Sequence, residues 1–332
     1  MTTFTYFIIF IIVLFLYIHI TSHYKKSEDL EIYEADYSNA KQIQEICDIK
    51  QPVLFDIGSG IPEELIVRPN LEEIEELAEK SNYEIHIKDT TDIHNNPDIA
   101  GDSIVLPFRS GYGLIETDKK SLFFSENNHE FVTEVLPYMR DMDEYLKPTF
   151  VGQTKYDLLF GSDKSYTACR YHTEYEKFLF VKSGKIQVKM TPWKSRNYLH
   201  PENDYINYEF RSPIDIWNPQ LQYKKDVENI KFLEFEVMDG FILYVPPFWF
   251  YSIRFMSGDT KPAIIESYTY NSIMNIAANL PQWSLYYLQQ SNTKTKVLPK
   301  KSETALDDTE KVPEIEPKIP KEENDDLADF KM

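Results

Sequence analysis

Basic residues and cysteines are scarce in this chain of 332 residues. Lysine and arginine number 35 against 54 aspartates and glutamates, which gives a formal net charge of -19. No run rich in lysine or arginine appears, and binding to nucleic-acid phosphates requires a concentrated basic surface, so we expect no nucleic-acid partner. The two cysteines, Cys47 and Cys169, are too few for a disulfide framework and are typical of a reducing compartment.

Several motifs that mark known chemistries are also absent. No Cys-x-x-Cys, Gly-x-Ser-x-Gly or Gly-x-Gly-x-x-Gly sequence occurs. The Gly-Ser-Gly at 58–60 is not followed by the Lys-Ser/Thr of a phosphate-binding loop, and His129-Glu130 lacks the second histidine of a zinc helix. No Asn-x-Ser/Thr glycosylation site is present, and no histidine follows His200. The common hydrolase, dinucleotide and zinc-protease patterns are therefore missing.

The N-terminal segment is the longest apolar run. Residues 4–20 carry no formal charge, and roughly 17 to 20 helical residues cross most of the hydrocarbon core of a bilayer. We predict a single transmembrane anchor over 1–24 that contacts the membrane through residues 4–20. A cleaved signal peptide is the alternative, but the basic n-region and the small-x-small cleavage site are missing. Lys25 and Lys26 follow the segment, so the positive-inside rule places the main domain in the cytosol.

The C-terminal segment has the composition of a disordered tail. From Lys294 onward the chain contains eight lysines, eleven carboxylates and a single aromatic residue, Phe330. Such a segment buries too little apolar surface to fold, so we predict a disordered acidic tail over 291–332. The tail is either a solvating spacer or a docking segment for an unknown protein partner.

Helices are expected mainly before residue 150. Asn39 and Gln42 form a capping pair for a helix over 39–48, and a capping box begins a second helix over 70–80. The helical region over 128–146 contains Pro137, which either begins a new helix or kinks the existing one. "QPVLFDI" and "YEIHIKD" have strand patterns, so residues 25–150 form an α/β part.

After this part the sequence changes to short strands. Aromatic and β-branched runs separated by turns are typical of a β-sandwich or a small barrel. The Ser-Gly in "VKSGKI" predicts a tight hairpin, and "SIMNIAANLPQWSLYYLQQ" returns to helical periodicity. The core of the domain is therefore predicted over 151–290. The expected strands are "YDLLFG", "SYTACRYHTE", "KFLFVKSGKIQVKM", "NIKFLEFEVM", "GFILYVPP", "WFYSIRF" and "PAIIESYTY".

Three segments occur in an order that resembles a known family. They are "LLFGSDKSYTACRYHTEYEKFLFVKSGKIQVKMTPW", "SPIDIWNPQ" and "FEVMDGFILYVPPFWFYSIRF". In this order they resemble the cupin-like Jumonji C oxygenases, including asparaginyl hydroxylase-type members, over roughly 150–270, with a looser likeness back to about 35. The resemblance implies a mainly β fold with flanking helices, a double-stranded β-helix of the cupin or jelly-roll type.

The resemblance also implies a metal centre, for which two registers are possible. Such enzymes hold Fe(II) with two histidines and one carboxylate and leave positions open for 2-oxoglutarate and O₂. In one register His172 takes the first histidine position and Glu174 the carboxylate position. In the other, which matches Thr167 to the threonine of the family, Arg170 takes the histidine position and His172 the acid position. Either way Arg170, His172 and Glu174 alternate onto one face of a strand.

The sequence departs from the family pattern at its other functional positions. Tyr251 stands where the second histidine is expected, and a tyrosine with a pKa near 10 is a poor replacement for imidazole. Ile186 stands where the family has the lysine that binds 2-oxoglutarate, and Ser267 stands where some members have an asparagine. The site is therefore predicted to be degenerate, with His172, Glu174 and Tyr251 as its metal-ligand candidates.

These observations lead to one functional prediction with alternatives. We predict a membrane-anchored, cupin-like module that binds a ligand or has a structural role without catalysis, and without a cofactor. The first alternative is a divergent Fe(II)/2-oxoglutarate-dependent hydroxylase, and the second is a cupin that binds a sugar or a nucleotide sugar. The candidate pocket residues are Thr167, Arg170, His172, Glu174, Lys177, Trp249, Tyr251 and Ser267.

Overall fold

The computed structural model describes residues 2–58, 60–66, 71–81, 83–95, 103–205, 207–257 and 262–295. Residues 1–290 form one compact unit, and residues from Ser291 onward are assigned to a second. Of the second unit only the residues up to Thr295 are described, as the end of a helix. The predicted disordered tail beyond Thr295 therefore lies outside the described residues.

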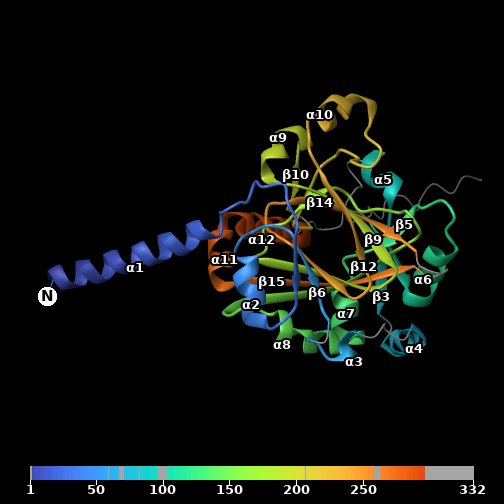
Figure 1. Cartoon of the computed structure of the whole chain (residues 1–332), viewed down its shortest axis with the longest axis horizontal. Helices are drawn as coiled ribbons and strands as arrows, with labels where there is room; N and C mark the ends of the chain where they lie inside the picture. The colour runs from blue at the N-terminus through green and yellow to red at the C-terminus, as the bar shows by residue number, and fades with distance from the viewer. Residues whose placement is uncertain are drawn as a thin grey trace, which may run out of the picture. The chain divides into compact units, whose positions relative to one another are not determined.

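Helices and short helical turns lie around the β-sheets, and the longest of them is at the N-terminus (Figure 1). The α-helices are α1 (Thr2–Ser22), α2 (Ala40–Cys47), α3 (Glu63–Ile66), α4 (Leu71–Ser81), α5 (Thr90–Asn95), α6 (Phe108–Thr117), α7 (His129–Val135), α8 (Asp143–Leu146), α9 (Arg196–Leu199), α10 (Lys224–Glu228), α11 (Ile273–Ala278) and α12 (Leu280–Thr295). The 3-10 helices are η1 (Pro137–Met142), η2 (Trp193–Ser195) and η3 (Leu221–Tyr223).

The described strands form two sheets, which confirms the prediction of a mainly β fold with flanking helices. The nine-stranded sheet has the order β1 (Tyr33–Asp36), β2 (Val53–Asp56), β13 (Phe241–Val245), β8 (Glu176–Ser183), β15 (Ala263–Ser272), β6 (Val151–Gly161), β5 (Phe123–Ser125), β3 (Glu84–Asp89) and β4 (Ile104–Pro107). The six-stranded sheet has the order β10 (Glu202–Asp204), β11 (Glu209–Arg211), β7 (Arg170–Tyr171), β14 (Phe250–Met256), β9 (Lys185–Thr191) and β12 (Leu233–Met238).

From β6 onward the chain passes repeatedly between the two sheets. Strands β6, β8, β13 and β15 lie in the nine-stranded sheet, while β7, β9, β12 and β14 lie in the six-stranded sheet. The pairs within each set of four are antiparallel. The strands before residue 150 extend the nine-stranded sheet at both of its ends, so the α/β part and the core share one sheet.

The nine-stranded sheet is covered on both faces. One face packs against helices from the N-terminal half in a core that includes Phe178 and Tyr268. The other face packs against the six-stranded sheet in a core that includes Leu179 and Ile265. Because successive side chains of a strand point to opposite faces, β15 is buried along its whole length.

Local signals in the sequence explain several helix ends. Asn39 caps α2, since its side chain accepts a hydrogen bond from the Gln42 backbone N–H at 3.0 Å. Pro137 begins the 3-10 helix η1 after α7 ends, so the first of the two alternatives for this proline is confirmed. The expected cap of α4 at Asn70 lies outside the described residues.

The expected hairpin at Ser183 and Gly184 is wrong. Strand β8 ends at Ser183 and β9 begins at Lys185, but β8 pairs with β13 and β15, while β9 pairs with β12 and β14. Gly184 has φ +73° and a Cβ there would lie 3.1 Å from the Ala263 Cα. The Ser-Gly pair therefore turns the chain from one sheet into the other at a point that leaves no room for a side chain.

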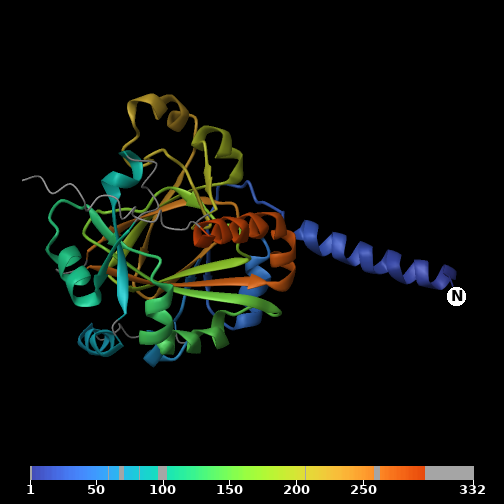
Figure 2. The same cartoon turned by 180° about the vertical axis from the view of Figure 1, so that it is seen from behind.

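Helix α1 is long and apolar enough to cross a bilayer, and none of its apolar window is buried in the protein. The segment that follows is held against the domain. The His23 ring lies edge-on to the Tyr175 ring with centres 5.2 Å apart, and the Tyr24 hydroxyl donates to the Ala278 carbonyl of α11. Figures 1 and 2 both show the end of α1 beside α11.

Glu176 is a fully buried carboxyl group on the helix-facing side of β8. Its Oε2 accepts a hydrogen bond from Gln44 Nε2 of α2 at 3.0 Å, whereas Oε1 has no hydrogen-bond partner among the described residues. Burial raises the pKa of Glu176 to about 8, against the opposing effects of Lys50 and Gln44.

Replacement of this carboxyl group by Glu176→Gln is expected to reduce the pH dependence of stability. Because the folded-state pKa of about 8 exceeds the ordinary value of 4.5, the folded chain binds more protons than the unfolded chain between these values. The free energy of unfolding therefore falls as the pH rises through this range. We expect the variant to lose on the order of 1 to 4 kcal/mol of that fall, measured by urea unfolding of the full chain in detergent. Glu45→Gln, an exposed carboxylate of α2, is the control, and an identical pH profile for both variants would contradict the assignment.

Candidate functional site

A cavity of about 810 Å³ lies between the two sheets. Its walls include residues of β6, β8 and β15 from one sheet and of β7, β11 and β14 from the other, with α7 and α12 at its edge. Along the inner face of the nine-stranded sheet, the row of Leu159, Ile265 and Val181 belongs to the apolar core. The next row combines Asp157 and Ser267 with the apolar Leu179, the row after it contains lysines and a threonine, and the cavity begins where these polar side chains appear.

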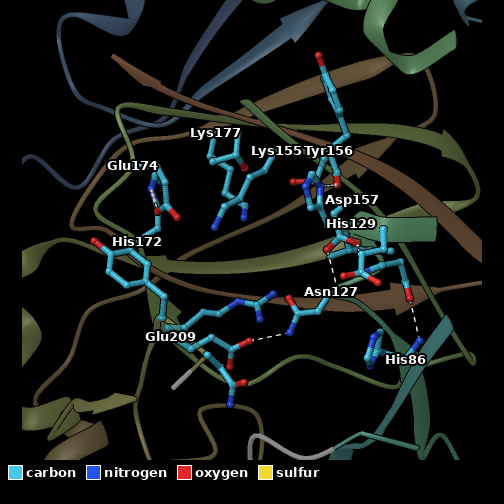
Figure 3. A pocket seen from close by; sticks show the side chains of 18 of the residues that line it. His86, Asn127, His129, Lys155, Tyr156, Asp157, His172, Glu174, Lys177 and Glu209 are labelled. Carbon is cyan, nitrogen blue, oxygen red and sulfur yellow. Dashed lines mark hydrogen bonds and ion pairs between the residues drawn. The ribbon is translucent and has the colours of Figure 1, made fainter. Parts of the chain in front are cut away.

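Two lysines face this cavity from one row of the sheet. Thr269 of β15 pairs with Lys155 of β6 on one side and with Lys177 of β8 on the other. Paired positions on neighbouring strands share a face, and two strand spacings separate the lysine backbones by about 10 Å. Figure 3 shows both amino groups directed into the cavity and close to each other in this view.

Neither lysine has a hydrogen bond or an ion pair with any residue that the structure describes. The Lys155 ammonium lies 5.7 Å from the centre of the Trp283 ring, at the outer limit of a cation–π contact. Burial lowers the pKa of Lys177, but Tyr251 and Glu174 outweigh it and raise this pKa above its ordinary value. Lys177 therefore stays protonated in the cavity at neutral pH.

The adjoining row adds a serine and a carboxyl group. Ser267 pairs with Asp157 across β15 and β6, is 1% exposed, and its hydroxyl has no hydrogen-bond partner among the described residues. The carboxylate oxygens of Asp157 accept the backbone N–H groups of Asn127 and Asn128 at 2.9 and 2.7 Å. Burial still raises the pKa of Asp157 above its ordinary value. Ser267 is thus a polar group of the cavity that no atom of the described residues satisfies.

His172 lies on the opposite side of the cavity, immediately after β7. Its Nε2 is 2.9 Å from the backbone carbonyl oxygen of Val245, which only accepts, so Nε2 carries the proton. Its Nδ1 is 3.4 Å from Oε2 of Glu174. The Tyr251 ring is edge-on to the imidazole, with ring centres 6.2 Å apart. These three predicted ligands are therefore neighbours around the cavity.

Glu174 is held in its ionised form. Burial raises its pKa, but His172, Lys177 and Lys155 outweigh burial and hold the pKa well below its ordinary value. The same oxygen that faces His172 accepts the Thr173 backbone N–H at 3.1 Å. Glu174 is thus a cavity carboxylate whose charge interacts with both lysines.

Arg170 lies beside these groups but its charge is neutralised inside the protein. Its Nη1 and Nη2 donate to the two carboxylate oxygens of Glu126 at 2.9 and 2.6 Å, a bidentate pair. Lys88 donates to Glu126 at 3.0 Å and to Glu209 at 3.4 Å. Burial raises the pKa of Glu126, but Arg170 and Lys88 outweigh it and hold the pKa below its ordinary value. The network therefore fixes one wall of the cavity.

The donor set does not fit an iron centre of two histidines and one carboxylate. His172 has only Nδ1 available, and no second histidine lines the cavity near it. The ammonium of Lys177 brings positive charge close to Glu174 and Tyr251, where a cation would bind. No three histidine, cysteine or acidic side chains within the described ranges are grouped to hold a metal ion.

No family model matches the chain, and no curated protein matches it. The likeness to the Jumonji C family therefore depends on the residues quoted above alone.

The structure brings together most of the pocket residues predicted from the sequence. Arg170, His172, Glu174, Lys177, Tyr251 and Ser267 line the cavity. Thr167 and Trp249 lie elsewhere. The Thr167 hydroxyl accepts the Ile253 backbone N–H at 3.1 Å, and Trp249 is buried in the core between the sheets.

Several residues of the cavity were not predicted from the sequence. Lys155 precedes the expected strand "YDLLFG", but β6 begins four residues earlier than Lys155, at Val151, so this lysine is part of the sheet. The alternation of β6 from Asp157 backwards would have placed it on the inner face. Asn127, in the loop after β5, lines the cavity, and the neighbouring Glu126 supports it through Arg170. No local pattern indicates either contact.

Removal of the guanidinium by Arg170→Met is expected to destabilise the fold. Glu126 would keep only Lys88 as a buried cationic partner, and breaking one half of a buried pair leaves an uncompensated charge. We expect a loss of about 2 to 4 kcal/mol in the free energy of unfolding, measured by urea titration of the full chain in detergent. The control is Arg109→Met, an exposed arginine paired with Glu75, for which we expect a loss below about 1 kcal/mol. Equal losses for the two variants would show that the network does not hold the wall.

Proposed function

We propose that this chain is a membrane-anchored, cupin-like module that binds a small anionic ligand in its cavity without catalysis. The observation that carries the proposal is the pair of cavity lysines, Lys155 and Lys177, which have no anionic partner in contact among the described residues. Both lysines are partly buried, a partly buried ammonium group without a partner loses part of its hydration, and a bound anion would supply the missing charge.

The surroundings of the lysines define the chemistry of the ligand. Carboxylate and phosphate groups are the anions that two ammonium groups and a hydroxyl donor bind best, and Ser267 offers such a hydroxyl. Glu174 is ionised and faces the same space, so hydroxyl or amino groups elsewhere on the ligand would find an acceptor. A volume of about 810 Å³ lies within the range of pockets for small molecules. The proposed ligand is therefore a small carboxylate or phosphate compound that also carries hydrogen-bond donors.

The fold proposed for this module is a double-stranded β-helix of the jelly-roll type. It is supported by the passage of β6 to β15 between two sheets with antiparallel pairing throughout. This connection, together with the motif order in the sequence, favours a relationship to the Jumonji C oxygenases in which the iron centre has been lost. The divergent Fe(II)/2-oxoglutarate hydroxylase stays the alternative, with His172 and Glu174 as its ligands.

The proposed location is a membrane, with α1 as a single transmembrane anchor and the main domain in the cytosol. The length and apolar character of α1 support the anchor, and Lys25 and Lys26 support the orientation. A cleaved signal sequence is the competing interpretation of the same helix. The acidic segment beyond α12 remains a candidate for docking a protein partner.

Loss of one cavity lysine is expected to weaken anion binding. We would titrate the full chain in detergent with phosphate, succinate and 2-oxoglutarate by isothermal calorimetry, and repeat the titrations with Lys155→Met and Lys177→Met. Each variant loses a charge-assisted contact, so we expect the best-bound anion to bind roughly 10- to 100-fold more weakly. Lys185→Met, an exposed lysine of β9 paired with Glu236, makes the same charge change outside the cavity and should keep wild-type affinity. Equal weakening by all three variants would show that the loss of affinity comes from the change in net charge, and would contradict the proposal.

Iron is expected to leave anion binding unchanged. We would measure bound metal by mass spectrometry, and the affinity for 2-oxoglutarate with and without Fe(II), in the wild type and in His172→Ala, both prepared anaerobically. We expect background iron in both proteins and the same affinity with and without the metal. Near-stoichiometric iron that His172→Ala abolishes would favour the hydroxylase over the binding module.

A further inference from the structure

We propose that the corner of the domain around α11 rests on the surface of the bilayer that α1 enters, with Phe150, Ile273 and Leu280 seated in the lipid headgroup region. The inference rests on the proposed membrane anchor. It adds a second contact with the lipid, made by the folded domain itself.

The chain between the anchor and the domain is short and is held by contacts with the domain. The apolar helix ends at Ser22, and Tyr24 already donates a hydrogen bond to the carbonyl of Ala278. Lys26 lies over the rings of Trp193 and Phe248, at 3.9 and 4.6 Å from their centres. A span of 20 residues covers about 30 Å, the thickness of the hydrocarbon core, so Tyr24 is at the interface. The helix α11 that Tyr24 contacts is therefore at the interface as well.

Large apolar side chains are exposed at this same corner. Ile273 begins α11 and is 57% exposed, and Leu280, two residues after the Tyr24 contact, is 58% exposed. Phe150 is joined to them by the hydrogen bond from the Ile273 backbone N–H to its carbonyl, at 3.0 Å, and is 83% exposed. Figures 1 and 2 agree that α11 lies where α1 leaves the domain.

The backbone conformation of Phe150 favours contact between its ring and something outside the folded domain. Its φ of +57° lies in the left-handed region, which a bulky side chain adopts at a cost. A glycine or asparagine would fit this turn more easily and would suit an aqueous surface. An aromatic ring held in such a turn and turned to solvent is suited to the headgroup region, where amphipathic and aromatic side chains gather.

The charge pattern selects a lipid surface over a protein partner. No charged residue and no histidine occurs between Ser267 and Thr293, in a chain that is 27% charged and carries a net charge of -19. An acidic domain is repelled by anionic lipid headgroups, and a segment that contributes no carboxylate, such as α11, is the part that can approach them. Interfacial contact of this kind scales with the apolar area that enters the headgroup layer.

The test uses the full chain in phosphatidylcholine vesicles with an environment-sensitive fluorophore at position 150. Phe150→Cys is labelled with a nitrobenzoxadiazole maleimide, because the native cysteines Cys47 and Cys169 are buried. Leu221→Cys is the matched control, since Leu221 is an apolar residue that is 94% exposed on η3, and the adjoining α10 is distant from α1 in both views (Figures 1 and 2). Unsubstituted chain treated with the reagent gives the background labelling.

We expect the label at position 150 to show blue-shifted emission and a severalfold stronger quenching by nitroxide-labelled lipid than the label at position 221. Equal, water-like signals from both labels in chains that float with the vesicles would overturn the inference and leave the anchor intact. A blue-shifted label that lipid nitroxides do not quench would also overturn it, since a second copy or the acidic tail would then cover the corner. Chains that fail to float with vesicles would refute the anchor itself.

Discussion

The burial of both faces of the nine-stranded sheet is the constraint on which the rest of the structure depends. Each central strand must supply one set of side chains to the helices and another to the second sheet, and the two sets alternate strictly. This alternation places Phe178 among the helices and Lys177 in the interior between the sheets. The cavity thus lies where the side chains that face the second sheet change from apolar to polar, while those that face the helices continue to form core.

The balance of charge around the cavity follows from this arrangement. Where a buried charge belongs to the wall, the protein supplies its partner, as in the bidentate pair of Arg170 and Glu126. The inner row of Lys155 and Lys177 differs, because the two lysines flank a threonine and meet no carboxylate within ion-pair distance in the described part of the chain. The charges of the cavity wall are paired, whereas those of the two lysines are not. This arrangement is expected of a preorganised binding site, since the paired wall residues cannot move in to neutralise the lysines.

Sequence patterns predicted features that depend on neighbouring residues and failed for contacts between residues far apart in the sequence. The cap of Asn39 depends on neighbours within four residues and was predicted from the sequence, whereas for Pro137 the sequence left a helix start and a kink as alternatives. The Ser-Gly turn at Gly184 has a local pattern that suits a hairpin, but the choice of partner strands is made by burial, which pairs β8 with β13 and β15. Lys155 was missed because its strand begins before the aromatic run that marked it.

The same distinction applies to the candidate site. Residues near the family-like motif, such as His172 and Ser267, were found because the motif fixes their spacing. Glu126 and Lys88 come from a loop and a strand far away in the sequence and support the cavity through their ion pairs with Arg170 and Glu209. The jelly-roll fold and the likeness to the oxygenases stay predictions, because no family model or curated protein supports them.

The docked segment after α1 has a consequence for motion. Contacts continue beyond Lys26, since Lys194 donates to the Glu28 carbonyl at 2.8 Å and Gln51 donates to Asp29 at 3.2 Å. A flexible tether would let a domain tumble above the bilayer, but a tether held at each of these points turns only with the domain. In the proposed membrane setting the chain from Tyr24 to Asp29 therefore turns with the domain, and bending between anchor and domain is confined to the short stretch between α1 and Tyr24.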